Sequence, residues 1–171
     1  MLSAAKHQPR RRAERPVSRA NARASRYESR FGVLVLDLDR FKSYNDTYGH
    51  LAGNDTLQRV ARSIRETVRT VDFPARYGGE EFAVIVPEID DASVAMIAER
   101  VRAAIEALPA PAGGATVTVS IGVAIYPQDG TTAESLFKSA DERLYVAKEK
   151  GRNRVVTRSL PAPRSTGRQS A

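Results

Sequence analysis

The sequence contains no cysteine, so disulfide bonds and zinc sites built on thiolates are excluded. It also has no run of apolar residues long enough to span a membrane. Both absences suit a cytoplasmic protein without a membrane partner, and we expect that location. With 171 residues the chain is long enough to bury one core without covalent cross-links. We therefore expect a single globular domain.

Acidic residues are scarce at the two ends of the chain. Residues 1–30 hold nine basic and two acidic side chains, and residues 159–171 hold two basic ones and no acidic one. Residues 31–158 have 16 basic against 18 acidic side chains, so the net charge of +7 belongs to the ends. Their composition predicts a basic, disordered segment over 1–30 and a disordered tail over 159–171. We expect 31–158 to form the folded domain.

Apolar residues in this body alternate between strand-like and helix-like spacing. The predicted strands cover residues 33–38, 82–86, 117–125 and about 154–157. The strand at 82–86 completes a hairpin that begins near Phe73. The predicted helices carry apolar faces over three stretches, the middle one capped by Asp90 and Asp91: 57–68, 94–108 and 136–147. Helices packed on a largely antiparallel central sheet describe an α+β fold of palm-like architecture.

The most informative segment is Arg-Tyr-Gly-Gly-Glu-Glu-Phe at residues 76–82. Gly78 and Gly79 lie between two strand-like runs, which predicts a hairpin turn, and they let a bulky anion approach the backbone closely. Two adjacent carboxylates, Glu80 and Glu81, repel each other and call for a cation. The segment therefore indicates a site for a divalent metal and a triphosphate. The alternative is an exposed acidic hairpin tip.

A second group of polar residues follows the first predicted strand. Asp37 and Asp39 stand at its carboxyl end, where folds of mixed helix and sheet often bind ligands. Lys42 can neutralise phosphate oxygens, and the amide of Asn45 can donate to and accept from a base edge. A lone aspartate at a strand end is more often a cap or turn residue. The lysine, the asparagine and the Gly-Gly-Glu-Glu turn that occur with it here favour a nucleotide site.

Five sequence blocks in this order resemble the GGDEF family of diguanylate cyclases, and the likeness covers roughly residues 31–157. The blocks are Asp-Leu-Asp-Arg-Phe-Lys at 37–42, Asn-Asp-Thr-Tyr-Gly-His at 45–50, the segment 76–82, Thr-Val-Ser-Ile-Gly-Val-Ala at 118–124, and Ala-Asp-Glu-Arg-Leu-Tyr-Val-Ala-Lys at 140–148 continuing through Gly-Arg-Asn at 151–153.

The resemblance implies that two GTP molecules, one on each of two protomers, condense to cyclic di-GMP with release of two pyrophosphates. It implies a homodimer and two Mg²⁺ or Mn²⁺ ions per active site. Asp37, Glu81 and the Leu38 carbonyl match the family's metal ligands. Glu80 is the candidate general base or a further metal ligand, and the residues leave that choice open.

The same resemblance assigns the contacts to substrate. Lys42, Lys148 and Arg152 match phosphate contacts, with Lys42 also stabilising charge that develops during the reaction. Asn45 resembles the family's guanine contact, and His50 lies in the same segment with a weaker claim to a ligand role. Gly78 and Gly79 would border the triphosphate.

One position departs from the family pattern. The family usually reads Gly-His-x-x-Gly-Asp where this chain has Asn54. An aspartate accepts from both the N1 and N2 hydrogens of guanine, whereas asparagine keeps one acceptor and turns a donor toward the second hydrogen. The neighbouring Asp55 should point elsewhere on a helix. We expect weakened GTP binding.

Arg69 and Asp72 form an Arg-x-x-Asp motif a short distance before the turn. The offset matches the family's inhibitory site, where dimeric cyclic di-GMP binds. Arginine suits a phosphate or a guanine Hoogsteen edge, and the carboxylate can accept from guanine N–H groups. The alternative is an ion pair at a helix end.

Three functions follow as hypotheses. The first is an active, product-inhibited diguanylate cyclase. The second is a catalytically weak or inactive domain that acts as a cyclic di-GMP receptor, which Asn54 and the lack of the family's usual front segment in 1–30 favour. The third, a nucleic-acid binder, rests on charge alone and lacks interleaved aromatic residues. No sensory domain is seen before the catalytic one, so we expect input through a partner or none.

Overall fold

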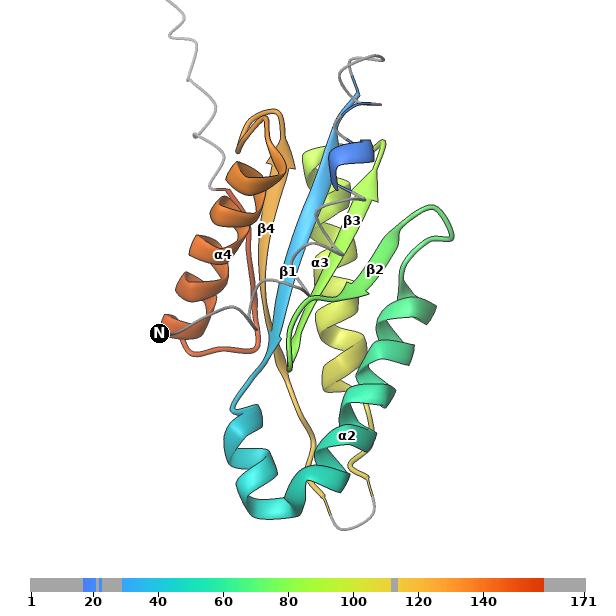
Figure 1. Cartoon of the computed structure of the whole chain (residues 1–171), viewed down its shortest axis with the longest axis vertical. Helices are drawn as coiled ribbons and strands as arrows, with labels where there is room; N and C mark the ends of the chain where they lie inside the picture. The colour runs from blue at the N-terminus through green and yellow to red at the C-terminus, as the bar shows by residue number, and fades with distance from the viewer. Residues whose placement is uncertain (1–16, 21, 23–28, 112–113, 159–171) are drawn as a thin grey trace, which may run out of the picture.

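The computed structural model describes residues 17–20, 22, 29–111 and 114–158. It is a central sheet with helices on both faces (Figure 1). The elements in chain order are β1 (Phe31–Leu38), α2 (Phe41–Thr67), β2 (Phe73–Arg76), β3 (Glu81–Pro87), α3 (Asp91–Glu106), β4 (Val119–Tyr126), α4 (Ala133–Glu149) and β5 (Val155–Val156). The strand order is β2-β3-β1-β4-β5, antiparallel except for the β4–β5 pair. The predicted α+β class is confirmed.

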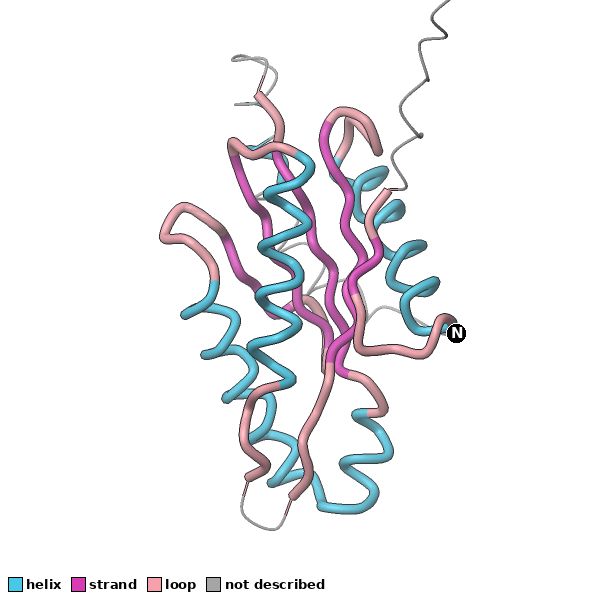
Figure 2. Tube along the Cα trace, turned by 180° about the vertical axis from the view of Figure 1, so that it is seen from behind, coloured by secondary structure: helices cyan, strands magenta, loops and turns pink. Residues whose placement is uncertain are grey.

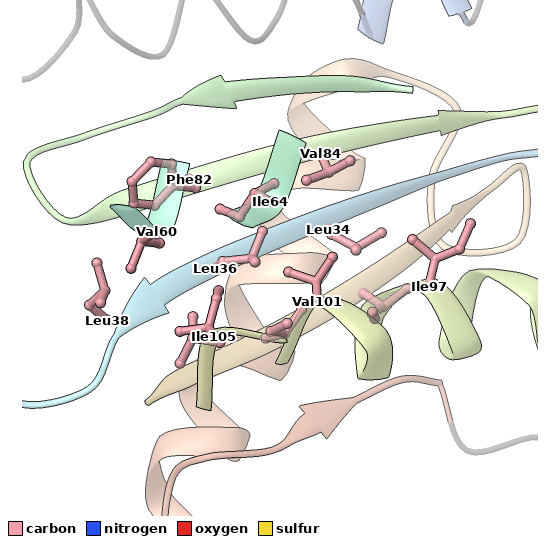
Figure 3. Close-up of a cluster of buried hydrophobic side chains, with 14 of the residues drawn as sticks. Leu34, Leu36, Leu38, Val60, Ile64, Phe82, Val84, Ile97, Val101 and Ile105 are labelled. Atoms are coloured by element: carbon pink, nitrogen blue, oxygen red, sulfur yellow. The ribbon is translucent and has the colours of Figure 1, made fainter. Parts of the chain in front are cut away.

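Strand β1 lies in the middle of the sheet and is buried along its whole length. Its side chains alternate between two cores, as the period of a strand requires. Leu34, Leu36 and Leu38 face α2 and α3, where they pack with residues such as Ile64 and Val101 (Figure 3). Figure 2 shows α3 running along this face of the sheet. A strand covered on both faces explains the continuous apolar run in the sequence.

The opposite face of β1 packs against α4. Val33 and Val35 share a cluster with Leu136, Ala140 and Leu144. Helix α4 begins with a capping box in which the Thr132 and Ser135 side chains each satisfy a backbone N–H of the other. The helix ends next to the site-bearing end of β1.

A glycine sets the distance between α4 and the sheet. A Cβ atom on Gly122 would lie 2.0 Å from the Ala140 carbonyl oxygen and 2.4 Å from the Leu144 nitrogen, both backbone atoms of α4. No side chain fits there, so Gly122 allows the helix backbone to rest directly on β4. This contact places the last turn of α4, with Lys148, against the end of β1.

Helix α2 is longer than the predicted apolar face. It begins at Phe41 and contains a kink at Gly49, whose φ of 83° and ψ of 160° are not helical. The sequence predicted only the later part, because the turn-forming Tyr-Gly-His stretch interrupts the periodicity. The first part presents Lys42 and Asn45 beside the end of β1.

Part of the amino-terminal segment is folded. Residues 17–20 are helical, and Val17 is fully buried in the cluster formed by α4 and β1. Disorder was expected throughout 1–30, and residues 17–20 depart from it: Val17 and Ala20 both pack against this cluster. Most of 1–30, and all of 159–171, lie outside the described residues. Within the described part, no helix has the length and apolar character needed to cross a bilayer.

Candidate active site

The register of the sheet brings the predicted metal ligands together. Asp37 on β1 lies directly opposite Glu81 on β3 in the antiparallel pair. Side chains opposite each other in such a pair have Cβ atoms about 5 Å apart. The Leu38 N–H donates to the Glu80 carbonyl at 3.3 Å, so the hairpin turn is tied to the end of β1. Residues 44 positions apart in sequence thus form one acidic site.

Asp37 is buried and paired with a lysine. The Lys148 Nζ lies 2.8 Å from the Asp37 Oδ1. Burial raises the pKa of the Asp37 carboxyl, Lys148 opposes that rise, and Asp39 adds to it. Burial also raises the pKa of Glu80, with Asp37 adding to the rise, Lys148 opposing it and Glu81 adding to it. The site therefore concentrates negative charge that one lysine only partly offsets.

The turn that carries the two glutamates is fixed by backbone contacts. The N–H groups of Tyr77 and Gly78 donate to the Glu81 carbonyl at 2.8 and 3.1 Å. Arg76 donates to the carbonyls of Gly78 and Gly79. A Cβ on Gly78 would lie 2.1 Å from the Glu81 Oε2, whereas a Cβ on Gly79 would meet nothing within 4 Å. Gly78 thus leaves room for the Glu81 carboxylate, and the space beside Gly79 is open.

The amino terminus of α2 lies at the same end of β1. Its N-cap residue, Arg40, has a left-handed backbone and gives no side-chain cap to the described helix. Free N–H groups at a helix start attract phosphate, because they carry the positive end of the helix dipole. Lys42, in the first turn, is exposed.

The predicted base-reading residues lie around the kink of α2. Asn45 has a buried side-chain oxygen without a hydrogen-bond partner among the described residues. It rests against Gly53, where a Cβ would lie 1.8 Å from that oxygen. An unpaired buried acceptor is costly, and an N–H on a base edge would relieve it. Asn54 and His50 are both exposed.

A groove of about 520 Å³ adjoins the start of α2. Two guanidinium-bearing residues, Arg40 and Arg152, line it together with the hydroxyl-bearing Ser43, Thr47 and Thr118. The side chain of Arg152 makes no hydrogen bond or ion pair with the described residues. The Thr47 hydroxyl donates to the Ser43 carbonyl and the Thr118 hydroxyl to the Asp39 carboxylate, which also lines the groove. The two arginines are therefore the groups that suit an anion here, so Arg152 stands where a phosphate could reach it.

Arg69 and Asp72 are already paired with each other. The Arg69 Nη2 lies 2.8 Å from the Asp72 Oδ1, and the Arg69 backbone N–H donates to the Asp72 Oδ2 at 2.8 Å. The same guanidinium donates to the Pro87 carbonyl. The Asp72 side chain is fully buried, while 41% of the Arg69 side chain is exposed. The ion pair at the helix end, our alternative interpretation of this motif, is what the structure contains.

The sequence pattern did not assign a role to Asp39, Thr118 or Asn153. The carboxylate of Asp39 accepts hydrogen bonds from the Thr118 hydroxyl at 2.7 Å and the Asn153 backbone N–H at 3.0 Å. The signal that could have identified Asp39 was its place at the strand end two residues after Asp37. Its partners lie 79 and 114 residues away, beyond the reach of a local pattern.

Comparison with known proteins agrees with this geometry. The family model for "Diguanylate cyclase, GGDEF domain" matches residues 7–154. The chain belongs to the GGDEF family. The match begins at residue 7, within the segment 1–30 that the sequence predicts to be disordered.

The curated relatives of this GGDEF domain are longer proteins. Response regulator PleD of Caulobacter vibrioides is 44% identical over 128 residues, covering 72% of this chain and 28% of PleD. Diguanylate cyclase A of Treponema denticola is 41% identical over 135 residues, covering 78% of this chain and 36% of the relative. The chain therefore spans about a third of the length of the curated relatives it matches.

Solved GGDEF domains share the whole fold. The GGDEF domain of YfiN from Pseudomonas aeruginosa superposes with a TM-score of 0.83 at 34% identity, covering 89% of this chain and 96% of that one. The GGDEF domain of DgcB from Caulobacter crescentus, solved in complex with c-di-GMP, gives a TM-score of 0.80 at 35% identity, covering 86% and 89%. The palm-like architecture expected from the sequence is that of this family.

The acidic residues of this GGDEF domain fit a divalent cation that is coordinated partly by protein carboxylates and partly by the phosphates of a nucleotide. In the described part of the chain, no three His, Cys, Asp or Glu side chains gather closely enough to hold a metal ion unaided. Mg²⁺ is usually bound by one or two carboxylates, with waters and substrate phosphates completing the shell. Asp37 and Glu81, which face each other across β1 and β3, could supply such a pair.

Replacing Lys148 with Met should raise the pH at which half of the metal binding is lost. Protonated carboxyls do not bind cations, and burial raises the pKa of both Asp37 and Glu80, so binding is lost as pH falls through these raised values. Lys148 lowers both pKa values, and its removal shifts the loss upward. Titration of Mn²⁺ binding against pH by electron paramagnetic resonance measures the midpoint. The exposed Lys150→Met is the control, and an unchanged midpoint in Lys148→Met contradicts the assignment.

Proposed function

We propose that this chain is a diguanylate cyclase that condenses two GTP molecules into cyclic di-GMP and releases two pyrophosphates. The observation that carries the proposal is the pairing of Asp37 with Glu81 across the sheet, with Glu80 beside them and Lys148 on Asp37. GTP is the expected substrate, and the cytoplasm is the expected compartment. No specific nucleic-acid or membrane partner is proposed.

Each protomer would hold one GTP, and catalysis would require a homodimer. The 3′-hydroxyl of one GTP attacks the α-phosphate of the other; an O–P bond forms, and the bond to the pyrophosphate oxygen breaks. The hydroxyl proton passes to a base, for which Glu80 is the candidate. Burial and the neighbouring carboxylates raise the pKa of Glu80, which brings it closer to the value that suits a general base near neutral pH.

The chain's own residues would bind and orient the triphosphate. Lys148 and Arg152 would contact phosphate oxygens, together with Lys42 and free N–H groups at the start of α2. Two Mg²⁺ or Mn²⁺ ions, held by Asp37, Glu81, the Leu38 carbonyl and in one alternative Glu80, would neutralise the triphosphate when bound. Asn45 would meet the guanine edge, with His50 nearby and Gly78 and Gly79 bordering the nucleotide.

The test is product formation by the purified chain. GTP is incubated with the protein and Mg²⁺ or Mn²⁺, and the product is identified by mass spectrometry. The proposal expects cyclic di-GMP and pyrophosphate in a ratio of one to two. GTP lacking its 3′-hydroxyl is the control and should give no cyclic product. Folded protein that forms no cyclic di-GMP under these conditions overturns the assignment.

Asn54→Asp should tighten GTP binding. The substitution restores an acceptor for each of the two guanine hydrogens, and one unpaired base-edge hydrogen costs about 1–3 kcal/mol, or roughly a ten- to hundredfold change in affinity. Selectivity for GTP over ATP should rise as well, because adenine offers no matching pair of donors. Steady-state KM values for GTP and inhibition constants for ATP measure both effects. An unchanged KM would mean that Asn54 does not contact the base.

We further propose that cyclic di-GMP inhibits the enzyme through Arg69 and Asp72. The buried Asp72 carboxylate would fix the guanidinium, whose exposed side would contact the ligand. The related GGDEF domain of DgcB, solved in complex with c-di-GMP, supports a ligand of this kind.

Arg69→Ala should relieve that inhibition. Loss of a charge-assisted contact predicts an increase of about tenfold or more in the concentration of cyclic di-GMP that halves the rate. Inhibition curves for the parent, Arg69→Ala and the exposed Arg65→Ala measure this. Identical curves for the parent and Arg69→Ala would remove the regulatory role.

A second candidate function is a cyclic di-GMP receptor with little or no turnover. The observation that favours it is Asn54, which would weaken recognition of guanine in the catalytic pocket while the Arg69–Asp72 pair is present. Tight binding of cyclic di-GMP without product from GTP would establish this function in place of the first.

A further inference from the structure

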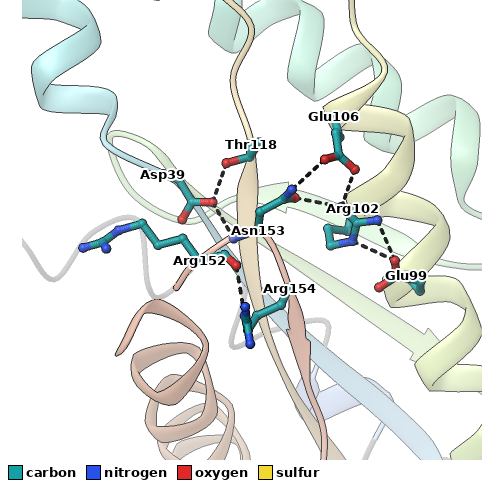
Figure 4. A network of polar contacts seen from close by, with 8 residues as sticks. All are labelled: Asp39, Glu99, Arg102, Glu106, Thr118, Arg152, Asn153 and Arg154. Atoms are coloured by element: carbon teal, nitrogen blue, oxygen red, sulfur yellow. Dashed lines mark hydrogen bonds and ion pairs between the residues drawn. The ribbon is translucent and has the colours of Figure 1, made fainter. Parts of the chain in front are cut away.

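A partly buried polar network connects the end of β1 with the loop between α4 and β5 (Figure 4). At its centre is the Asp39 carboxylate. Its Oδ2 accepts from the Thr118 hydroxyl at 2.7 Å and the Asn153 backbone N–H at 3.0 Å, and its Oδ1 accepts from the Ser120 hydroxyl at 2.6 Å. Its backbone N–H donates to the Thr118 carbonyl at 2.9 Å. Three protein donors thus occupy a carboxylate that lies only two residues from Asp37.

The loop held by Asp39 has an unusual backbone. Arg152 and Asn153 have φ values of 64° and 46°, the left-handed region that residues other than glycine seldom adopt. Such a conformation is strained, more so for Arg152 than for Asn153, since asparagine tolerates it better, and it persists where the surroundings determine it. The Arg152 N–H donates to the Ala147 carbonyl at 3.0 Å, and Asp39 binds the N–H of the next residue. Both strained residues are therefore tethered by their backbones.

The network also holds the loop from the side of α3. The Asn153 side chain donates to the Glu106 carboxylate at 2.6 Å and accepts from Arg102 at 2.7 Å. Arg102 in turn binds Glu99. Figure 4 shows the Arg152 side chain extending away from these contacts, so its guanidinium is left for another partner. Arg152 is one of the residues that line the groove beside the start of α2.

We propose that Asp39 is a positioning residue that presets Arg152 for the terminal phosphates of GTP. Resting on the proposed function, this inference gives the second aspartate of the Asp-Leu-Asp segment a task different from that of the first. One carboxylate oxygen of Asp37 is paired with Lys148 in the acidic site. Both carboxylate oxygens of Asp39, in contrast, accept hydrogen bonds from Thr118, Ser120 and the Asn153 backbone. Asp39 also lines the groove, but protein donors already occupy its carboxylate oxygens. It would therefore act through the loop and not by contact with the nucleotide or its metal.

The test is a double-mutant cycle of Asp39→Asn and Arg152→Ala. Binding of a non-hydrolysable GTP analogue and of GMP is measured by calorimetry with Mn²⁺. Asp39→Asn replaces a charge-assisted bond to the Asn153 N–H and should weaken the GTP analogue roughly tenfold or more while leaving GMP within about twofold. In the Arg152→Ala background the same change should cost little further affinity. The outer-network variant Glu99→Gln should bind as the parent does.

Other outcomes overturn the inference. Additive losses in the cycle, or equal losses for the GTP analogue and GMP, would give Asp39 a merely structural role. Weaker binding of Mn²⁺ alone to Asp39→Asn would make it a metal ligand. If that variant does not fold, Thr118→Val removes one donor and should give a smaller loss confined to the GTP analogue. Analogue binding without product overturns the proposed function alone, whereas a parent chain that does not bind the analogue overturns both.

Discussion

Replacing either glutamate of the turn with glutamine is expected to stop cyclic di-GMP formation, with the rate falling by about a thousandfold or more. Glu81 faces Asp37 across the sheet, so its neutral variant removes one of the two carboxylates proposed to hold the divalent cation. Removing a group that stabilises developing charge costs on the order of a hundred- to a thousandfold, and loss of the cation removes more. Product formation by Glu81→Gln at the parent's rate would contradict the site.

The two variants also decide between the roles left open for Glu80. If Glu80 is the base, Glu80→Gln keeps Mn²⁺ binding and loses turnover; if it is a ligand, both are lost together. The exposed Glu142→Gln on α4 controls for the loss of one negative charge. Thermal melting of all three variants separates lost chemistry from lost fold.

Gly122→Val is expected to unfold the domain or to lower its free energy of unfolding by about 3 kcal/mol or more. The new side chain would meet the backbone of α4 at Ala140 and Leu144, which cannot rotate out of the way as a side chain can. The expected fall in Tm is roughly 10 °C for a domain of this size. Because α4 carries Lys148, any fold that survives should also lose the ion pair with Asp37 and with it phosphate binding.

Gly79→Ala is the matched control for stability, since its Cβ would meet nothing within 4 Å. Its Tm should lie within a few degrees of the parent. A Gly122→Val protein that melts with the parent would mean that α4 does not rest on β4 as described.

The sequence predicted the elements whose apolar spacing is strong. Strand β1 is a continuous apolar run because both of its faces are covered, and α3 follows its predicted face from an Asp90 cap that accepts from the Ser93 N–H. The first part of α2 was missed because the kink at Gly49 separates it from the regular pattern. Val17 was missed because one buried residue makes no periodicity.

The sequence predicted the site residues that lie within the family's sequence blocks. It did not predict the parts of the site whose geometry depends on contacts between distant residues. Pairing of Asp37 with Glu81 follows once β1 and β3 are neighbours, but the strand order and the parallel β5 depend on packing of the whole chain. The Asp39 network joins residues up to 114 positions apart, and no local sequence pattern predicts it. Between two interpretations of Arg69 and Asp72, only coordinates reveal the existing ion pair.

The most direct test of the central claim is the initial rate of cyclic di-GMP formation by the purified chain over a hundredfold range of protein concentration. Two protomers that each bring one GTP predict a rate that rises with the square of protein concentration while monomers prevail, and linearly once dimers form. Folded protein that binds cyclic di-GMP but makes none at any concentration contradicts the account and identifies a receptor.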